Sequence, residues 1–146
     1  MRNKVLNMLN QDLVKIAEQI HIEWDNALEN NDIEQLLKLY SVDAIVESPL
    51  IPHLLNQDSG ICHGHGELRA LLEIVAKRKP IIRKYHKNKH FTDGKTIIWE
   101  YPRLTPDGEQ MDFVEVMEIR AGLIQHHRVY WGWFGFKIIK ENQYSR

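Results

Sequence analysis

The hydrophobic pattern of the sequence changes its period near residue 80. Before that point apolar residues recur every three or four positions, and from residue 81 onward they alternate with polar residues between turn signals. The first spacing is typical of amphipathic helices and the second of strands. Helices followed by a meander of about four antiparallel strands predict an α+β fold, in which a curved sheet covered by helices on one face leaves a concave pocket.

Three helices are predicted in the first half. The first ends near the asparagine pair at residues 30–31, and Asp32 is placed to cap a short second helix that includes Tyr40. The third is expected over residues 66–79, where Pro80 ends it. The apolar stripe expected on the first helix consists of Leu13, Ile16, Ala17, Ile20, Trp24 and Leu28.

Short strands and turns complete the predicted architecture. Residues 44–48 form a strand candidate that Pro49 ends, and residues 50–60 are expected to form a long loop. The later strands are expected at residues 82–91, at residues 96–104 and in a final hairpin, with turns at residues 93–94, 106–108 and 120–122.

Composition limits the kind of protein. With 146 residues, 43% of them hydrophobic, the chain has the length and apolar content of one domain with its own core, so residues 1–146 are expected to form a single domain. A net charge of −1 gives no electrostatic footprint for nucleic acid. No apolar stretch has the length of a membrane span or the form of a signal peptide, and Cys62 is the one cysteine. We therefore expect a cytoplasmic protein without disulfides.

The last hairpin is predicted to place a carboxylate opposite an imidazole. If residues 120–122 form a three-residue loop, Glu115 faces His127 on a mostly apolar face of the sheet. Desolvation raises the pKa of a carboxylate, whereas a neighbouring imidazole favours the charged pair, so the two groups form a tunable acid–base couple. The alternative interpretation is a buried polar pair that only fixes the register of the hairpin.

Three segments resemble a known superfamily. They are residues 27–49 (ALENNDIEQLLKLYSVDAIVESP), the glycine-containing helix entry at residues 63–72 (HGHGELRALL) and the closing hairpin at residues 116–131 (VMEIRAGLIQHHRVYW). Over about residues 12–136 the chain resembles the nuclear-transport-factor-2-like superfamily, which includes the SnoaL-like polyketide cyclases, the ketosteroid isomerases and the limonene epoxide hydrolases. The resemblance implies a SnoaL-like domain with a cone-shaped, cystatin-like sheet and three N-terminal helices that enclose a pocket. The same scaffold serves enzymes and binding modules.

Two reaction centres of the superfamily are incomplete in this sequence. Ser48 stands where the ketosteroid isomerases carry their general-base Asp, and a hydroxyl takes no proton without help. The resemblance matches Trp24 to the oxyanion-hole Tyr of those enzymes and Glu115 to their second, protonated oxyanion-hole Asp. The indole N–H can still donate one hydrogen bond. Val129 stands where the epoxide hydrolases carry their water-activating Asp.

The same mapping implies an apolar cavity with a few polar groups, which suits a flat hydrophobic small molecule. The implied lining consists of Trp24, Tyr40, Ser48 and Leu71 from the first half and Glu115, Met117, His127, Val129 and Trp131 from the last two strands. The strand before them adds either Trp99 and Tyr101 or the alternate pair Ile98 and Glu100, because the sequence leaves its register open.

The histidine spacing raises the hypothesis of a metal site, but the neighbouring residues argue against it. His63 and His65 would share a face on a strand, as two ligands of a cupin do, but the glycines beside them favour a helix-entry turn. Adjacent His126 and His127 point to opposite faces of a strand and cannot bind one ion there. We expect no metal and no cofactor. The roles of His63, His65 and His53, which lies in the loop expected at the pocket rim, stay open.

The C-terminal segment is too apolar to face water alone. Residues 130–139 (YWGWFGFKII) require burial against the helices or against a second subunit. Members of the resembled superfamily commonly dimerise through the outer face of the sheet, so we expect a homodimer.

Two functions remain in competition. The first is an isomerase, cyclase or lyase that transfers protons on a hydrophobic substrate, with Glu115 and His127 as the acid–base pair and Trp24 orienting an oxygen. The second is a ligand-binding or assembly module that uses the same cavity without catalysis. The opposed ionisable pair favours the first, and Ser48 in place of a carboxylate favours the second.

Overall fold

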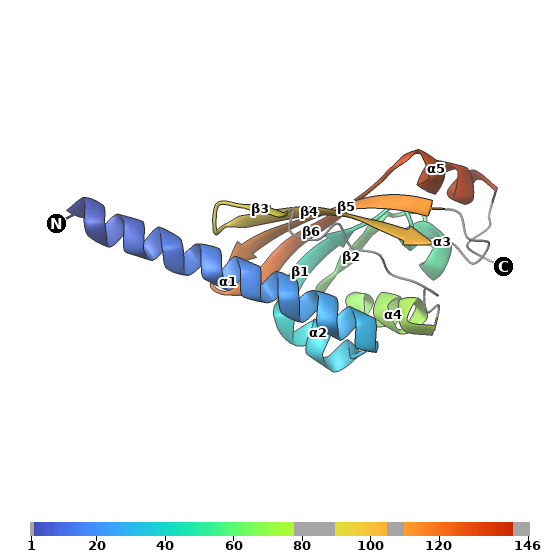
Figure 1. The fold of residues 1–146 in the computed structure, drawn as a ribbon. Helices are drawn as coiled ribbons and strands as arrows, with labels where there is room; N and C mark the ends of the chain where they lie inside the picture. The colour runs from blue at the N-terminus through green and yellow to red at the C-terminus, as the bar shows by residue number, and fades with distance from the viewer. Residues whose placement is uncertain (1, 78–89, 105–109, 142–146) are drawn as a thin grey trace.

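The computed structural model shows helices packed against one face of a curved, open sheet (Figure 1). It describes residues 2–77, 90–104 and 110–141. None of the helices in these ranges is long and apolar enough to cross a membrane. The elements are α1 (Arg2–Asn30), α2 (Ile33–Leu39), β1 (Tyr40–Glu47), α3 (Ile51–Leu55), β2 (Ile61–His63), α4 (Gly64–Lys77), β3 (His90–Thr92), β4 (Thr96–Leu104), β5 (Gln110–Arg120), β6 (Leu123–Trp131) and α5 (Trp133–Lys140).

The α+β class predicted from the change of period is confirmed. The six described strands follow the order β2-β1-β6-β5-β4-β3. All neighbouring pairs are antiparallel except β1 and β6, which run parallel, so the sheet is mixed. The parallel pair arises because β1, the first strand in the chain, lies beside β6, the last, near the centre of the sheet.

Several predicted boundaries differ from those of the structure. Asp32 caps α2 as expected, since its carboxylate accepts a hydrogen bond from the backbone N–H of Gln35 at 2.9 Å. Tyr40, however, begins β1 instead of ending the helix. The loop expected at residues 50–60 contains the short helix α3. The turn expected at residues 106–108 and most of the strand expected at residues 82–91 lie outside the described residues.

The closing hairpin has a different turn from the one predicted. Ala121 and Gly122 form a two-residue turn with φ angles of 51° and 77°, and Arg120 pairs with Leu123. Positive φ at both central positions is the requirement of a type I′ turn, whose twist matches that of the strands. The prediction of a three-residue loop at residues 120–122 was therefore wrong.

A β-bulge then decides which face of the sheet carries the acid–base pair. In the register of the turn alone, Glu115 and His127 would lie on opposite faces, because successive side chains alternate. Gln125 is an extra residue in β6, and beyond it the pairs shift by one, so that Glu115 pairs with Val129 and Met117 pairs with His127. Glu115 and His127 are thus diagonal neighbours on one face, not the direct partners predicted.

The helical layer covers the face that carries these two side chains. Figure 1 shows α1, α2 and α4 on one side of the sheet and α5 on the other side, near one end. The core between the helices and the sheet includes Ala17, Ile20, Trp24, Leu36, Leu68, Leu71, Ile97, Trp99, Phe113 and Met117.

Several contacts attach α1 to the edge of the sheet, and two of them are made by His21 and by the turn at Gly94. The ring of His21 lies 4.3 Å from the ring of Trp99 in β4. Burial, with a smaller contribution from His90, lowers the pKa of His21 to about 4, so the ring packs in its neutral form at pH 7. The second contact is the turn at Gly94, whose φ is 85° and which lies directly against Leu13.

We expect Gly94→Ala to destabilise the fold more than Gly122→Ala does. A Cβ at either position requires a left-handed conformation, which costs about 1–2 kcal/mol. At Gly94 it would also lie 2.6 Å from the Cβ of Leu13 and 2.9 Å from its backbone carbon, which adds about 1–3 kcal/mol of overpacking. At Gly122 nothing lies within 4 Å. Urea unfolding of both variants measures the difference, and equal losses would show that the contact with α1 is unimportant.

Candidate functional site

A chain of buried hydrogen bonds joins four side chains from α1, β1, β6 and β5. The indole Nε1–H of Trp24 donates to the hydroxyl of Tyr40 at 2.9 Å. That hydroxyl lies 2.8 Å from Nδ1 of His127, and Nε2 of His127 lies 2.6 Å from Oε2 of Glu115. Glu115 and His127 are 2% and 3% exposed, so the pair is shielded from solvent. Trp24, Glu115 and His127 were predicted from the sequence as catalytic residues, and Tyr40 as part of the cavity lining. The hydrogen bonds that link these four side chains were not predicted.

The following arrangement of protons satisfies each of these hydrogen bonds. Burial raises the pKa of Tyr40 far above its ordinary value, so the phenol keeps its proton. Because Tyr40 accepts the Trp24 N–H, its own O–H is available to donate to Nδ1 of His127. A neutral imidazole that accepts at Nδ1 carries its proton at Nε2, from which it donates to the carboxylate of Glu115.

The chain fixes the role that Trp24 can take. Its single N–H is directed to Tyr40 and not to the cavity. The hypothesis that Trp24 orients a substrate oxygen is therefore replaced by a positioning role, in which Trp24 holds Tyr40 and Tyr40 holds His127. The edge of the Trp24 ring system also packs against His127, with ring centroids 5.6 Å apart.

A cavity of about 90 Å³ adjoins these hydrogen bonds. The predicted site residues that line it are Trp24, Tyr40, Ser48, Leu71, Glu115, His127, Val129 and Trp131. The rest of its wall is apolar and includes Leu28, Val46, Leu68, Leu72, Val75 and Phe113. The cavity has room for a small group next to the carboxylate.

Three residues were predicted to line the cavity but are not among its lining residues in the structure. Met117 is fully buried in the core and does not reach the cavity. Trp99 is buried behind Trp24, with ring centroids 5.5 Å apart, and also does not line it. Tyr101 pairs with Phe113 in the strand register, but its side chain lies outside the described residues. The register of β4 does place Trp99 on the inner face, since Trp99 pairs with Glu115.

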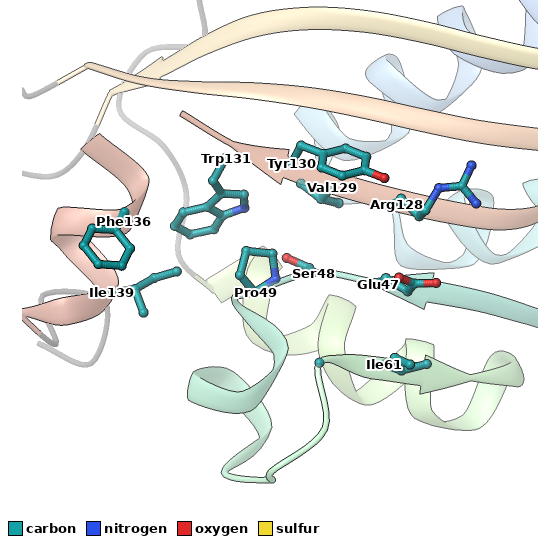
Figure 2. A pocket seen from close by; sticks show the side chains of 11 residues that line it. Glu47, Ser48, Pro49, Ile61, Arg128, Val129, Tyr130, Trp131, Phe136 and Ile139 are labelled. Carbon is teal, nitrogen blue, oxygen red and sulfur yellow. The ribbon is translucent and has the colours of Figure 1, made fainter. Parts of the chain in front are cut away.

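A second, larger pocket of about 510 Å³ was not predicted from the sequence. It lies between the ends of β1 and β6 and the helix α5, with Phe136 and Ile139 of α5 on one side (Figure 2). Figure 2 shows the ring of Trp131 near Ile139 and Pro49. The strongly apolar segment at residues 130–139 was the signal that could have indicated it, but this segment was expected to be covered, not to form a wall.

The remaining histidines are distributed over separate contacts. His65 lies 3.0 Å from the backbone oxygen of Tyr40, and Nε2 of His126 lies 2.5 Å from Oε1 of Glu47 on the outer face. The side chain of His53 belongs to α3. In the part of the chain that the structure describes, no three His, Cys, Asp or Glu side chains are placed to hold a metal ion.

Comparison with known proteins identifies the fold. No protein-family profile and no curated protein match the sequence. An NTF2-like protein of unknown function from Burkholderia pseudomallei is 18% identical, with a TM-score of 0.68 over 85% of this chain and 95% of that one. A SnoaL-like protein of unknown function from Burkholderia thailandensis is 16% identical, with a TM-score of 0.67 over 82% and 96%. TerC, co-crystallised with polyporic acid, is 16% identical, with a TM-score of 0.68 over 86% and 98%.

The chain therefore has the nuclear-transport-factor-2-like fold, of the type found in SnoaL-like proteins. The fold implied by the resemblance of the three sequence segments is confirmed. Identities of 16–18% carry no activity over to this chain, so its function has to be argued from the site itself.

We expect Tyr40→Phe to destabilise the protein. The change removes one oxygen but leaves the Trp24 N–H and Nδ1 of His127 buried without their shared partner. Each buried group left in this way costs about 1–3 kcal/mol. Tyr130→Phe is the matched control, because Tyr130 is half exposed and its change is expected to stay within about 0.5 kcal/mol. Denaturant unfolding measures both, and similar losses would contradict the importance of the chain.

Proposed function

We propose that the protein catalyses proton transfer next to a carbonyl group of a hydrophobic small molecule, with Glu115 as the base. The observation that carries this proposal is a carboxylate 2% exposed, hydrogen-bonded to an imidazole, on the wall of an apolar cavity. A dry site keeps water from competing for the proton and strengthens the interactions of the charged groups. Isomerisation, cyclisation and elimination all begin with such a step.

The two members of the pair take different roles. Both ring nitrogens of His127 are engaged, Nδ1 with Tyr40 and Nε2 with Glu115. His127 is therefore a positioning residue that holds the carboxylate by its Nε2–H, and Glu115 is the catalytic residue that meets the substrate. This division refines the earlier hypothesis, in which the two side chains acted as an equal acid–base pair.

The proton transfer requires only side chains of this protein. The Glu115 carboxylate takes a proton from the carbon beside the carbonyl, the C–H electron pair forms a C=C bond, and the carbonyl π pair moves to the oxygen. The Ser48 hydroxyl, which lines the same cavity, is the donor that we assign to that oxygen. Its Oγ accepts the Leu50 N–H at 3.2 Å, and this bond leaves the hydroxyl proton to donate. Return of the proton from Glu115 completes the reaction.

Deuterium exchange tests the proposal without knowledge of the natural substrate. Benzylacetone in D₂O is expected to gain deuterium beside its carbonyl faster with the protein than without it, as followed by proton NMR. Glu115→Gln is expected to lower this rate by about 10²–10⁴-fold, the range of general-base catalysis. Glu100→Gln removes an exposed carboxylate on β4 and is expected to change nothing. Binding of benzylacetone without exchange in the wild type would favour the ligand-binding module instead.

We also propose a homodimer formed through the outer face of the sheet. Phe91, Ile98 and Tyr130 share this face. Phe91 pairs with Ile98, Ile98 with Val116 and Val116 with Arg128, and Tyr130 lies two residues beyond Arg128 on the same side of β6. They are 75%, 37% and 53% exposed. Exposed apolar side chains on one face are typical of a protein interface.

The dimer is expected to dissociate when a charge is placed on that face. Light scattering of the wild type at micromolar concentration is expected to give twice the 17.3 kDa of one chain. Ile98→Glu is expected to give the mass of one chain, since it buries an unpaired carboxylate in the interface. Ile22→Glu changes an exposed residue on α1 and is expected to leave the dimer intact. A wild-type monomer would contradict the proposal.

The single cysteine supports a cytoplasmic location, which we infer from its environment. Cys62 lies fully buried in β2 and forms no disulfide. Burial, together with the charge of Glu67, raises the pKa of its thiol to about 11. Such a thiol is protonated at pH 7 and inert, and the core needs no cross-link from an oxidising compartment.

A further inference from the structure

The helix α5 carries an exposed pair of aromatic side chains. Trp133 and Phe136 lie one turn apart on it, and their rings stack with centroids 6.3 Å apart. The two residues are 74% and 59% exposed. Another face of α5 packs on the sheet, because Gly135 lies so close to Trp131 that a Cβ there would be 2.4 Å from its ring. The aromatic pair therefore projects from a helix that is held in place by its other side.

The larger pocket of about 510 Å³ lies beside the same helix. Phe136 and Ile139 of α5 line it on one side, and Pro49 and Ile61 line it on the other (Figure 2). Its volume is within the roughly 300–1,000 Å³ of sites that hold drug-sized molecules, so an indole ring fits inside. A projecting aromatic pair and an apolar recess are thus neighbours on the surface of one chain.

The pocket is continuous with the outer face of the sheet. Glu47, Arg128 and Tyr130 line it. Tyr130 belongs to the face through which we propose the dimer, Arg128 lies two residues earlier on the same side of β6, and Glu47 pairs with Arg128. Figure 1 places α5 on this side of the sheet as well. Two copies that meet through their outer faces therefore bring both features to the interface.

A projection and a recess on one surface suit a contact between identical chains. In a two-fold dimer both copies use the same surface patch, so this patch has to be complementary to itself. Here Trp133 supplies the projection and the pocket supplies the recess. One rotation then forms the same contact twice, once in each copy.

The charges beside these two features are complementary. Lys140 is exposed and lies one turn beyond the aromatic pair on the same face of α5. At the edge of the pocket, the side chain of Glu47 is 40% exposed, and its partner within the chain is His126, which carries no permanent charge. Arg128, the cation at that edge, is already paired with Glu118 at 2.6 Å. A lysine from outside therefore meets a carboxylate there, and such complementarity favours one orientation of the partner.

We propose that this pocket is filled by Trp133 of a second copy of the chain, and that the two copies exchange this contact symmetrically. In each copy the incoming indole lies between α5 and the end of β1, and the incoming Lys140 approaches Glu47. The inference rests on the proposed homodimer and adds the side chains that anchor it.

Sedimentation equilibrium of the full chain measures the dissociation constant of the dimer. Trp133→Ala removes the projection, and Ile61→Trp fills the pocket; Ile139→Trp fills it from α5, so the result does not depend on one variant folding. Each change is expected to raise the dissociation constant at least about tenfold, because both copies lose a buried tryptophan contact. Phe134→Ala is the matched control, since it removes a ring 41% exposed on another face of α5, and it is expected to leave the dimer unchanged.

Mixing two weakened variants tests the exchange directly. Trp133→Ala keeps an open pocket, and Ile61→Trp keeps its own Trp133, so a mixed pair can still form one of the two contacts. Native mass spectrometry separates the two chains by mass and is expected to show more mixed dimers than the half given by random pairing. Random pairing, or fewer mixed dimers than that, would overturn the proposal.

The same variants separate this inference from the proposed dimer. If Ile98→Glu is monomeric but Trp133→Ala dimerises like the wild type, the dimer through the sheet stands and the exchange is overturned. If Trp133→Ala dissociates but Ile98→Glu does not, the exchange stands and the contact through the sheet fails. An unchanged Trp133→Ala dimer that no longer binds phosphatidylglycerol vesicles, when the wild type does, would assign the aromatic pair to a membrane surface and also overturn the exchange.

Discussion

The hydrogen-bonded chain from Trp24 through Tyr40 and His127 to Glu115 is the interaction on which the rest of the site depends. It joins the helical layer to three strands across the core, and each of its members lies almost wholly away from water. In such an environment a polar group without a partner is costly, so the four side chains constrain one another's positions. Stability and candidate chemistry therefore depend on the same contacts, and the carboxylate is held in a defined place before any ligand arrives.

This arrangement separates the protein from the better-known reaction centres of the same fold. The resemblance to the ketosteroid isomerases matches Ser48 to their general base, whereas the base proposed here is Glu115, which lines the same cavity as Ser48. A shared scaffold thus positions acid–base groups differently by exchanging a few side chains.

Much of the fold could be predicted from local pattern, and the differences have identifiable causes. The cap at Asp32 and the hairpin signal at residues 93–94 act over three or four residues, and both are found as expected. Tyr40 was assigned to a helix because apolar spacing does not distinguish the last turn of a helix from the first residue of a buried strand. The bulge at Gln125 has no clear local signature, since it depends on how the strand pairs with its neighbours.

The sequence by itself determined the order of helices and strands, the alternation of the last two strands and the presence of Glu115 and His127 on apolar segments. These features follow from side-chain periodicity, which is a local property. Only the tertiary structure decided that β1 lies beside β6, that a bulge returns His127 to the face of Glu115, and that Tyr40 and Trp24 complete the chain behind them. It also decided that α5 forms a pocket wall, because contacts between segments far apart in the chain are set by packing and not by the local pattern.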